Sequence, residues 1–185
     1  MKASGLVASA AALGGVMATA VTSSEAHAAG AHAASTSTED RAFRGRMFFA
    51  NDLQFDTISQ AAERIFPKDE NGPGAIDLAV PYFIDNQLAS GYGFNSREYT
   101  MGPHFEGAAT QGYQTALNNR DLFLQGIDAI NLQSKATFGK NFTEITDAQK
   151  DEILKMCEAG KIPMPGVSSA YFFSRLKLTV LAGVY

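Results

Sequence analysis

The first stretch with a sustained helical period is Asn51-Asp52-Leu53-Gln54-Phe55-Asp56-Thr57-Ile58-Ser59-Gln60-Ala61-Ala62-Glu63-Arg64-Ile65-Phe66-Pro67. Its apolar residues recur every three or four positions, which is the spacing of one face of an α-helix. Asn51 followed three residues later by Gln54 resembles a capping box, so we expect a helix to begin there and to end before Pro67. The expected apolar face consists of Leu53, Ile58, Ala61, Ala62 and Ile65.

Four later segments carry similar helical signals, and no segment shows the sustained alternation of a half-buried strand. Thr146 and Gln149 form a second capping-box pattern, and Gly160 and Gly183 are expected to end helices. The sequence therefore predicts an all-α fold, a single small helical domain of about five helices. The four later helices are expected at residues 80–88, 118–137, 146–160 and 168–183.

Two connections between these helices have distinct compositions. Residues 68–74 are typical of a turn, since an Asn71-Gly72 pair tolerates positive φ and two glycines bracket a proline. Residues 90–117 combine glycines, prolines and aromatic residues without a period, which predicts a long ordered loop. Loops of this length in a compact domain are usually functional, so we expect the loop to contact another molecule.

The N-terminal part of the chain differs in composition from the rest. Residues 6–21 are uncharged and weakly apolar, and a small-x-small pattern follows at 26–28, which is typical of a secretory signal peptide. A disordered low-complexity tail is the alternative. The sequence thus predicts a signal peptide at 1–28, a flexible linker at 29–48 and the helical domain at 49–185.

Net charge and rare residues exclude several classes of protein. The formal net charge is −4, which argues against a nucleic-acid binder or a polybasic membrane binder. The chain has one cysteine, Cys157, and only His104 among its three histidines lies outside the N-terminal region. This composition excludes a zinc finger, an iron–sulfur site, a c-type haem attachment motif and an intramolecular disulfide.

A set of motifs follows these elements in a characteristic order. The most distinctive part is 64–75 followed by 80–88. Further motifs are Tyr92-Gly93, Met101-Gly102-Pro103, Arg120-Asp121-Leu122-Phe123, Gly126-Ile127-Asp128-Ala129-Ile130-Asn131, Phe138-Gly139-Lys140 and Phe172-Phe173. This ordered set resembles the gluconate 2-dehydrogenase subunit 3 family over about residues 48–185.

The resemblance implies a small subunit of a membrane-bound periplasmic dehydrogenase for sugars or sugar acids. In such complexes a large subunit binds FAD and oxidises the substrate, and a multihaem cytochrome c subunit carries haem c and passes electrons to quinone. The small subunit exports the large subunit by the twin-arginine route and stabilises it. The resemblance therefore implies a non-catalytic chain without a cofactor, associated with the membrane through the cytochrome rather than by a span of its own.

Both ends of the chain differ from the family pattern. Residues 1–5 resemble the tail of a twin-arginine motif without its arginine pair, so we expect the natural start to lie upstream. Family members usually continue past the last helix into a segment that contains tryptophan, whereas this chain has none. We therefore expect the natural protein to be longer at both ends.

Cys157 has two possible roles. It lies four residues after Ile153 and three after Leu154, which favours a small buried apolar residue. The leader, however, predicts an oxidising compartment, where an odd cysteine suggests pairing with another chain. A disulfide between Cys157 and the large flavoprotein subunit is the alternative.

No catalytic, cofactor-binding or metal-binding residue is expected. The spacing of Asp69, Glu70, Asp77 and Asp85 does not match a calcium loop, so turn and cap roles are favoured. A loop histidine such as His104 can act as a general base, but no orienting partner is visible, which favours a structural or interface role. The predicted partner contacts are Asp69, Glu70, Tyr92, Tyr99, Met101 and His104.

Two rival functions stay open at this point. One is a stand-alone secreted enzyme that uses His104 with a nearby acid. The other is an export chaperone that leaves the flavoprotein after translocation. The substrate of the complex is not readable from this chain, because the resemblance places specificity in the large subunit.

Overall fold

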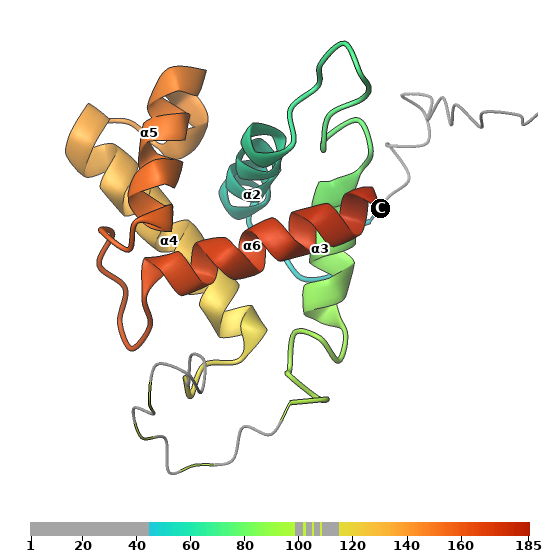
Figure 1. The fold of residues 1–185 in the computed structure, drawn as a ribbon, viewed down its shortest axis with the longest axis vertical. Helices are drawn as coiled ribbons and strands as arrows, with labels where there is room; N and C mark the ends of the chain where they lie inside the picture. The colour runs from blue at the N-terminus through green and yellow to red at the C-terminus, as the bar shows by residue number, and fades with distance from the viewer. Residues whose placement is uncertain (1–44, 99–101, 103–104, 106–107, 109–114) are drawn as a thin grey trace, which may run out of the picture. The chain divides into compact units, whose positions relative to one another are not determined.

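Helices make up most of the described part of the chain. The structure, a computed structural model, describes residues 45–98, 102, 105, 108 and 115–185. These residues contain no β-strand, which confirms the predicted all-α class. The elements are α2 (Asp52–Ile65), α3 (Val80–Ala89), α4 (Asn119–Phe138), the 3-10 helix η2 (Phe142–Glu144), α5 (Asp147–Glu158) and α6 (Ser169–Val184) (Figure 1).

Most helix ends lie where the capping residues predict them. The Asn118 side chain accepts a hydrogen bond from the backbone N–H of Asp121 at 2.9 Å and caps α4. At α5 the Thr146 N–H donates to the Gln149 side-chain oxygen at 3.0 Å, so this capping box is confirmed. Gly139 follows α4 with φ 73°, a left-handed conformation that glycine adopts without steric cost.

Asn51 caps α2 as predicted, but two details of the predicted helix ends are wrong. Asn51 caps α2 through one bond, from the Leu53 N–H at 2.9 Å, and not through a reciprocal box with Gln54. Gly183 does not end the last helix, since α6 continues to Val184. Instead, a Cβ at Gly183 would lie 2.8 Å from Phe83 Cδ1, so the glycine permits a close contact between α6 and α3.

The turn between α2 and α3 forms without the positive φ that Asn71-Gly72 allows. Neither residue is among the described residues with positive φ. The Asp69 carboxylate accepts the N–H groups of Asn71 and Gly72 at 2.8 and 3.2 Å, and this side chain closes the turn. The left-handed residue of the connection is Ala79, at φ 59°, directly before α3.

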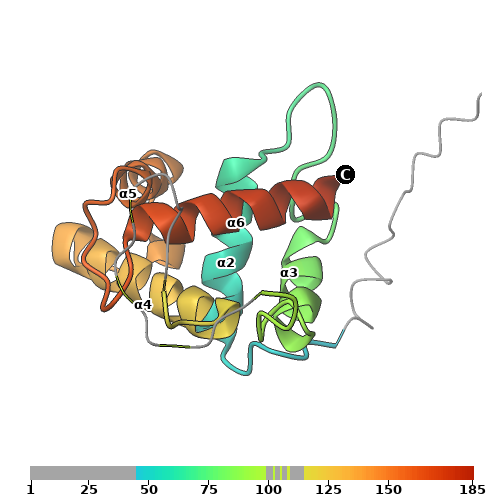
Figure 2. The same ribbon diagram turned by 60° about the horizontal axis from the view of Figure 1, so that its bottom comes forward.

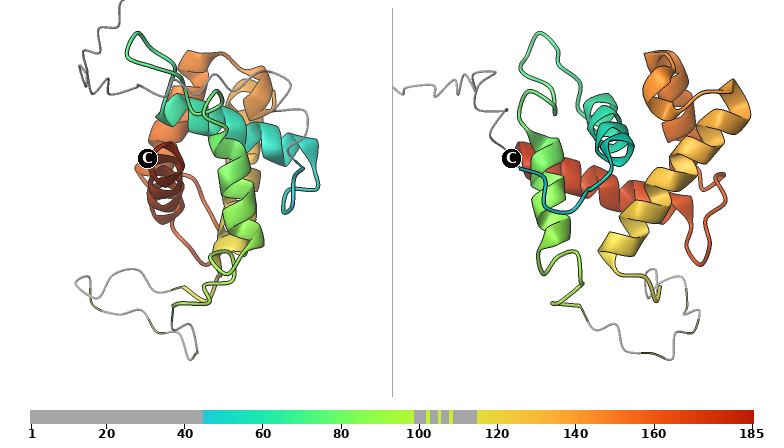
Figure 3. Two further views of the ribbon diagram at one scale, coloured as in Figure 1. Left: turned by 90° about the vertical axis from the view of Figure 1, so that its right-hand side faces the viewer. Right: turned by 180° about the vertical axis from the view of Figure 1, so that it is seen from behind.

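Helix α6 organises the core. It contacts α2, α3, α4 and α5 (Figures 1 and 2), and the view from behind shows α2 between α3 and the α4–α5 pair (Figure 3). A Cβ at Gly126 of α4 would lie 2.3 Å from the buried Phe172 ring of α6, so glycine allows these helices to cross closely. The largest fully buried side chains are Phe49, Phe123, Phe142, Phe172, Ile58, Ile84, Leu88, Leu122, Ile127, Ile130, Ile153 and Leu176.

The predicted loop over 90–117 is only partly described. Residues 91–98 form successive turns after α3, and residues 115–118 lead into α4. Most of the predicted loop between them lies outside the described residues. In the part of the chain that is described, no helix combines the length and apolar character that crossing a membrane requires.

Candidate functional site

A buried carboxylate fixes the segment that precedes α2. Asp85 of α3 is fully buried, and it accepts hydrogen bonds from the backbone N–H groups of Met47, Phe48 and Phe49. The bonds from Phe48 and Phe49 to Oδ1 measure 3.1 and 2.8 Å. Three consecutive donors satisfy a group that would otherwise be costly to bury. Asp85 therefore holds residues 47–49 against the helical domain.

The sequence pattern explains why Asp85 faces inward. It lies one position after Ile84 and three before Leu88, both fully buried. Its role is neither the turn nor the helix cap that we expected for the acids of this region. Asp85 joins two segments more than 30 residues apart, and a local pattern gives no sign of such a partner.

The fixed segment places one aromatic ring against an arginine. The Arg120 guanidinium carbon lies 4.9 Å from the centre of the Phe48 ring and 4.4 Å from the centre of the Phe94 ring. We call Phe48, Arg120 and Phe94 the Arg120 stack. Such cation–π contacts contribute about 0.5–1 kcal/mol each at exposed sites. Phe94 is 57% exposed and Met47, beside Phe48 in the chain, is 74% exposed, so the stack lies at the surface.

The turn after α3 is tied to the first residues of α4. The Arg120 N–H donates to Gly93 O at 3.1 Å, and the Asn119 N–H donates to Asn95 Oδ1 at 2.8 Å. The Asn119 side chain also donates to Tyr92 O at 2.9 Å. A Cβ at Gly93 would lie 2.0 Å from Leu88 O and 2.8 Å from Arg120 Cγ, so glycine permits both close approaches. These bonds hold Phe94 and Arg120 in a fixed relation.

A polar hollow of about 500 Å³ lies along the same turn. Asn95 and Asn119, the two side chains that join the turn to α4, form part of its wall. The hydrogen bonds that join this turn to α4 therefore support both the hollow and the Arg120 stack. The lining residues are Gln87, Ser90, Gly91, Tyr92, Asn95, Ser96, Arg97, Glu98 and Asn119.

The predicted partner contacts fall into separate places. Asp69 and Glu70 are exposed in the segment 68–74 before α3, which we call the acidic turn, whereas Tyr92 follows α3. Tyr92 is half-buried against the core, and its hydroxyl lies 3.0 Å from Thr179 Oγ1 of α6. The structure therefore does not bring Tyr92 together with the acidic turn. Tyr99, Met101 and His104 lie outside the described residues.

The acidic turn is charged and pre-formed. Hydrogen bonds from the side chain and backbone of Asn71 lower the pKa of Asp69 below its usual range. Lys68 pairs with Asp77 at 3.2 Å, which offsets one negative charge nearby. Glu70 is also exposed, so the turn presents acidic groups to solvent. No group of three or more metal-ligating side chains gathers within the described residues.

Cys157 is buried within its own chain. Its side chain is 1% exposed, and Sγ donates a weak hydrogen bond to Ser169 O at 3.5 Å. Burial raises the pKa of the thiol to about 12. This environment matches the structural role that helical spacing favours. A disulfide with another chain, which stays a prediction, would require this side chain to become accessible.

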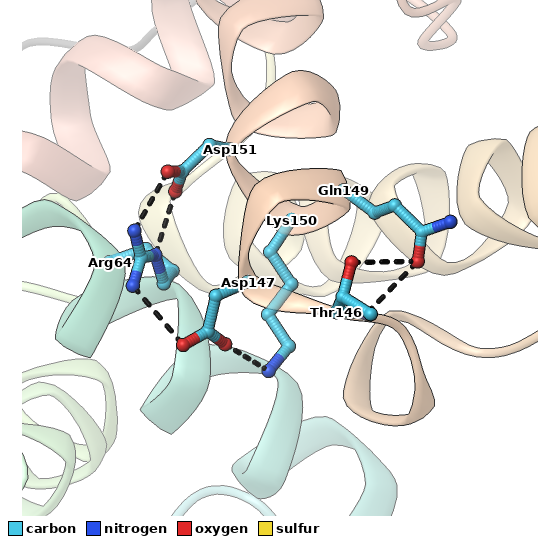
Figure 4. A network of polar contacts seen from close by, with 6 residues as sticks. All are labelled: Arg64, Thr146, Asp147, Gln149, Lys150 and Asp151. Atoms are coloured by element: carbon cyan, nitrogen blue, oxygen red, sulfur yellow. Dashed lines mark hydrogen bonds and ion pairs between the residues drawn. The ribbon is translucent and has the colours of Figure 1, made fainter.

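An ion-pair network joins α2 to α5. Arg64 binds Asp151 through two bonds of 2.7 Å and reaches Asp147 at 3.3 Å (Figure 4). The hydrogen bond from Arg64 lowers the pKa of Asp151, and the bond from Lys150 lowers that of Asp147. Arg64 belongs to the motif that carries the family resemblance, and its side chain fixes the relation of two helices.

Sequence reasoning missed Asp85 and Arg120 as site residues. Arg120 carried a local signal, because a cation in the first turn of a helix opposes the helix dipole and needs another reason to be there. Asp85 carried a weaker one, an acid among the apolar residues of a short helix. Neither signal names the residues that these side chains contact.

The fold and the exposed surfaces define a small all-α chain, and a comparison with known families identifies it. Residues 52–185 match the family described as gluconate 2-dehydrogenase subunit 3. The match covers more than half of the chain and all five α-helices of its described part. The chain belongs to the gluconate 2-dehydrogenase subunit 3 family. Comparisons with curated proteins and with solved structures gave no match.

Proposed function

We propose that this chain is the non-catalytic small subunit of a periplasmic gluconate 2-dehydrogenase-type complex. It binds a large FAD-containing subunit, exports that subunit by the twin-arginine route and stabilises it afterwards. The large subunit oxidises gluconate to 2-keto-gluconate, or a related sugar acid, and a multihaem cytochrome c subunit anchors the complex at the membrane. The observation that carries the proposal is the family match over residues 52–185, because the family is itself a dehydrogenase subunit.

In this proposal the redox cofactors and the binding surface belong to different chains. FAD and haem c would reside on the two partners, and the small subunit would contribute surface. Exposed apolar and charged groups on the described residues, such as Phe94, Met47 and the acidic turn at 68–74, are suitable for contacts of this kind.

Co-expression provides the test. The chain is expressed with the large FAD-containing subunit, which is sought among the neighbouring genes, and FAD-dependent gluconate oxidation is measured in the periplasm and membranes with a dye acceptor. Deletion of the small-subunit gene should abolish exported activity. Unchanged export of active flavoprotein without the small subunit would contradict the proposal.

The two rival functions give different results in the same system. A transient export chaperone would restore exported activity but would not co-purify with flavoprotein from membranes. A stand-alone enzyme would oxidise gluconate as a purified chain with the dye and without flavin. Non-reducing electrophoresis of the purified complex also tests the Cys157 disulfide, because an unbridged small subunit migrates alone.

A further inference from the structure

Arg120 lies where a positive charge is electrostatically unfavourable. It is the second residue of α4, next to the positive end of the helix dipole. Arg46, Arg64 and Arg175 each pair with a carboxylate. The Arg120 guanidinium has no such pair among residues 45–98 and 115–185, where its contacts are the two aromatic rings. The charge therefore lacks a partner within the described part of its own chain.

The N–H donors of the Arg120 guanidinium remain available for a contact with another molecule. A guanidinium carries its N–H donors in its plane, and aromatic rings on its faces do not use them. The guanidinium carbon of Arg120 lies over the Phe48 and Phe94 rings, 4.9 and 4.4 Å from their centres, and neither ring offers a negatively charged acceptor to the N–H donors. A planar anion that approaches in the guanidinium plane can accept two of these donors, and carboxylates suit this fork geometry.

The surroundings of Arg120 are those of a protein contact. Phe94 and Met47 are 57% and 74% exposed, and aromatic residues, methionine and arginine are the residue types enriched in interfaces. The surface is also held in advance, since Asp85 fixes the backbone at 47–49 and Gly93 accepts the Arg120 N–H. Little ordering is then needed on binding, which favours affinity.

We propose that the Arg120 stack is a docking anchor for an acidic side chain of the large flavoprotein subunit. An aspartate or glutamate of that subunit binds the guanidinium edge, and apolar residues beside it pack on Phe94 and Met47. Charge complementarity indicates an acidic partner group. The net charge of the chain is −4, but the unpaired Arg120 cation makes this part of its surface attractive to a carboxylate and not to a basic segment. The inference rests on the proposed function, which supplies the partner.

The test measures binding of the chain to the purified, FAD-loaded large subunit that the co-expression experiment uses. Arg120→Gln is expected to raise the dissociation constant at least about tenfold, as for a hot-spot residue. Arg120→Lys keeps the charge but loses the planar fork, so an intermediate loss is expected. Lys135→Gln removes one positive charge from the exposed far end of the same helix and should change binding less than about twofold.

A second substitution keeps the test decisive. Circular dichroism and the thermal midpoint show whether Arg120→Gln is folded. If it is not, Phe94→Ala decides, since this ring is mostly exposed, and a loss of about fivefold or more is expected. Raised salt should weaken wild-type binding more than Arg120→Gln binding, because only the wild type forms the ion pair.

Failure of the inference can be distinguished from failure of the proposed function. Wild-type binding that Arg120→Gln and Phe94→Ala leave unchanged overturns the anchor and leaves the proposed function intact. No binding of the wild type to the flavoprotein overturns both. Arg120-dependent binding of gluconate to the isolated chain would assign the stack to a free carboxylate, and would also overturn the docking anchor.

Discussion

Asp85 shows how a single buried acid can hold a segment that has no secondary structure. Its carboxylate replaces the hydrogen bonds that residues 47–49 would make to water. Because the group is fully buried, loss of its acceptor atoms leaves backbone donors unpaired. The same residue also sets the position of Phe48, one face of the Arg120 stack.

Substitution of Asp85 tests this role. Asp85→Asn replaces one acceptor oxygen with a donor group that faces a backbone N–H, so the free energy of unfolding should fall by about 2 kcal/mol. Urea denaturation at pH 7 measures the change. Asp128→Asn, an exposed acid on α4, is the matched control and should alter stability by less than about 0.5 kcal/mol. Equal effects of the two substitutions would contradict the role of Asp85 in holding residues 47–49.

Cys157 allows a second test at the scale of one residue. Thiolate is the reactive form, and burial raises the pKa of this thiol to about 12, so little thiolate exists at pH 8. Reaction of the folded chain with a thiol-specific disulfide reagent should therefore be slow, and should become fast in denaturant. The absorbance of the released thiol follows both rates. Fast reaction of the folded chain would show an accessible cysteine.

Among the helices, contact depends on small residues and on one ion-pair network. Gly126 and Gly183 let α6 approach α4 and α3 closely, and Arg64 joins α2 to α5. Arg64 and Asp151 have side chains 25% and 34% exposed, so solvent screens the pair in part. Its contribution is accordingly about 1 kcal/mol and not that of a fully buried pair.

The Arg64 network predicts a pH dependence of stability. The pKa of Asp151 is lower in the folded protein than its value of about 3.9 in an unfolded chain. The stabilisation is therefore present above pH 4 and is lost as the pH falls through the folded-state pKa. Arg64→Gln should lower the free energy of unfolding by about 1 kcal/mol at pH 7 and by less near pH 3.

Urea denaturation across this pH range measures the difference. Lys135→Gln, which removes an exposed charge, should show no such dependence on pH. A loss for Arg64→Gln that is the same at pH 7 and pH 3 would mean that packing, and not the ion pair, accounts for the effect.

At the scale of the whole molecule, the helical domain includes the segment before its first described helix. Phe49 is 2% exposed in the core, and residues 47–49 bind Asp85. A chain of residues 50–185 should therefore be less stable than one of residues 45–185, by about 3 kcal/mol or more. Thermal and urea denaturation of the two purified chains compare them directly. Equal stability would show that this segment adds nothing to the domain.

Local signals in the sequence predicted the helices well and the long-range contacts poorly. Asn118, Thr146 and Gly160 act on residues a few positions away, so their roles follow from spacing alone. Gly183 was misread as a helix end because a glycine that ends a helix and one that admits a neighbouring ring look the same in sequence. The contacts of Asp85 and Arg120 depend on how α2, α3 and α4 meet, which spacing does not encode.

The position of α6 has a consequence for synthesis. This helix contacts α2, α3, α4 and α5, and it is the last of the five to leave the ribosome. A nascent chain that stops before Ser169 lacks the surface against which all four earlier helices pack, so its apolar faces stay open to aggregation and proteolysis. The domain is therefore expected to close its core only after α6 has been synthesised, and products that lack this helix should be degraded before they meet a partner.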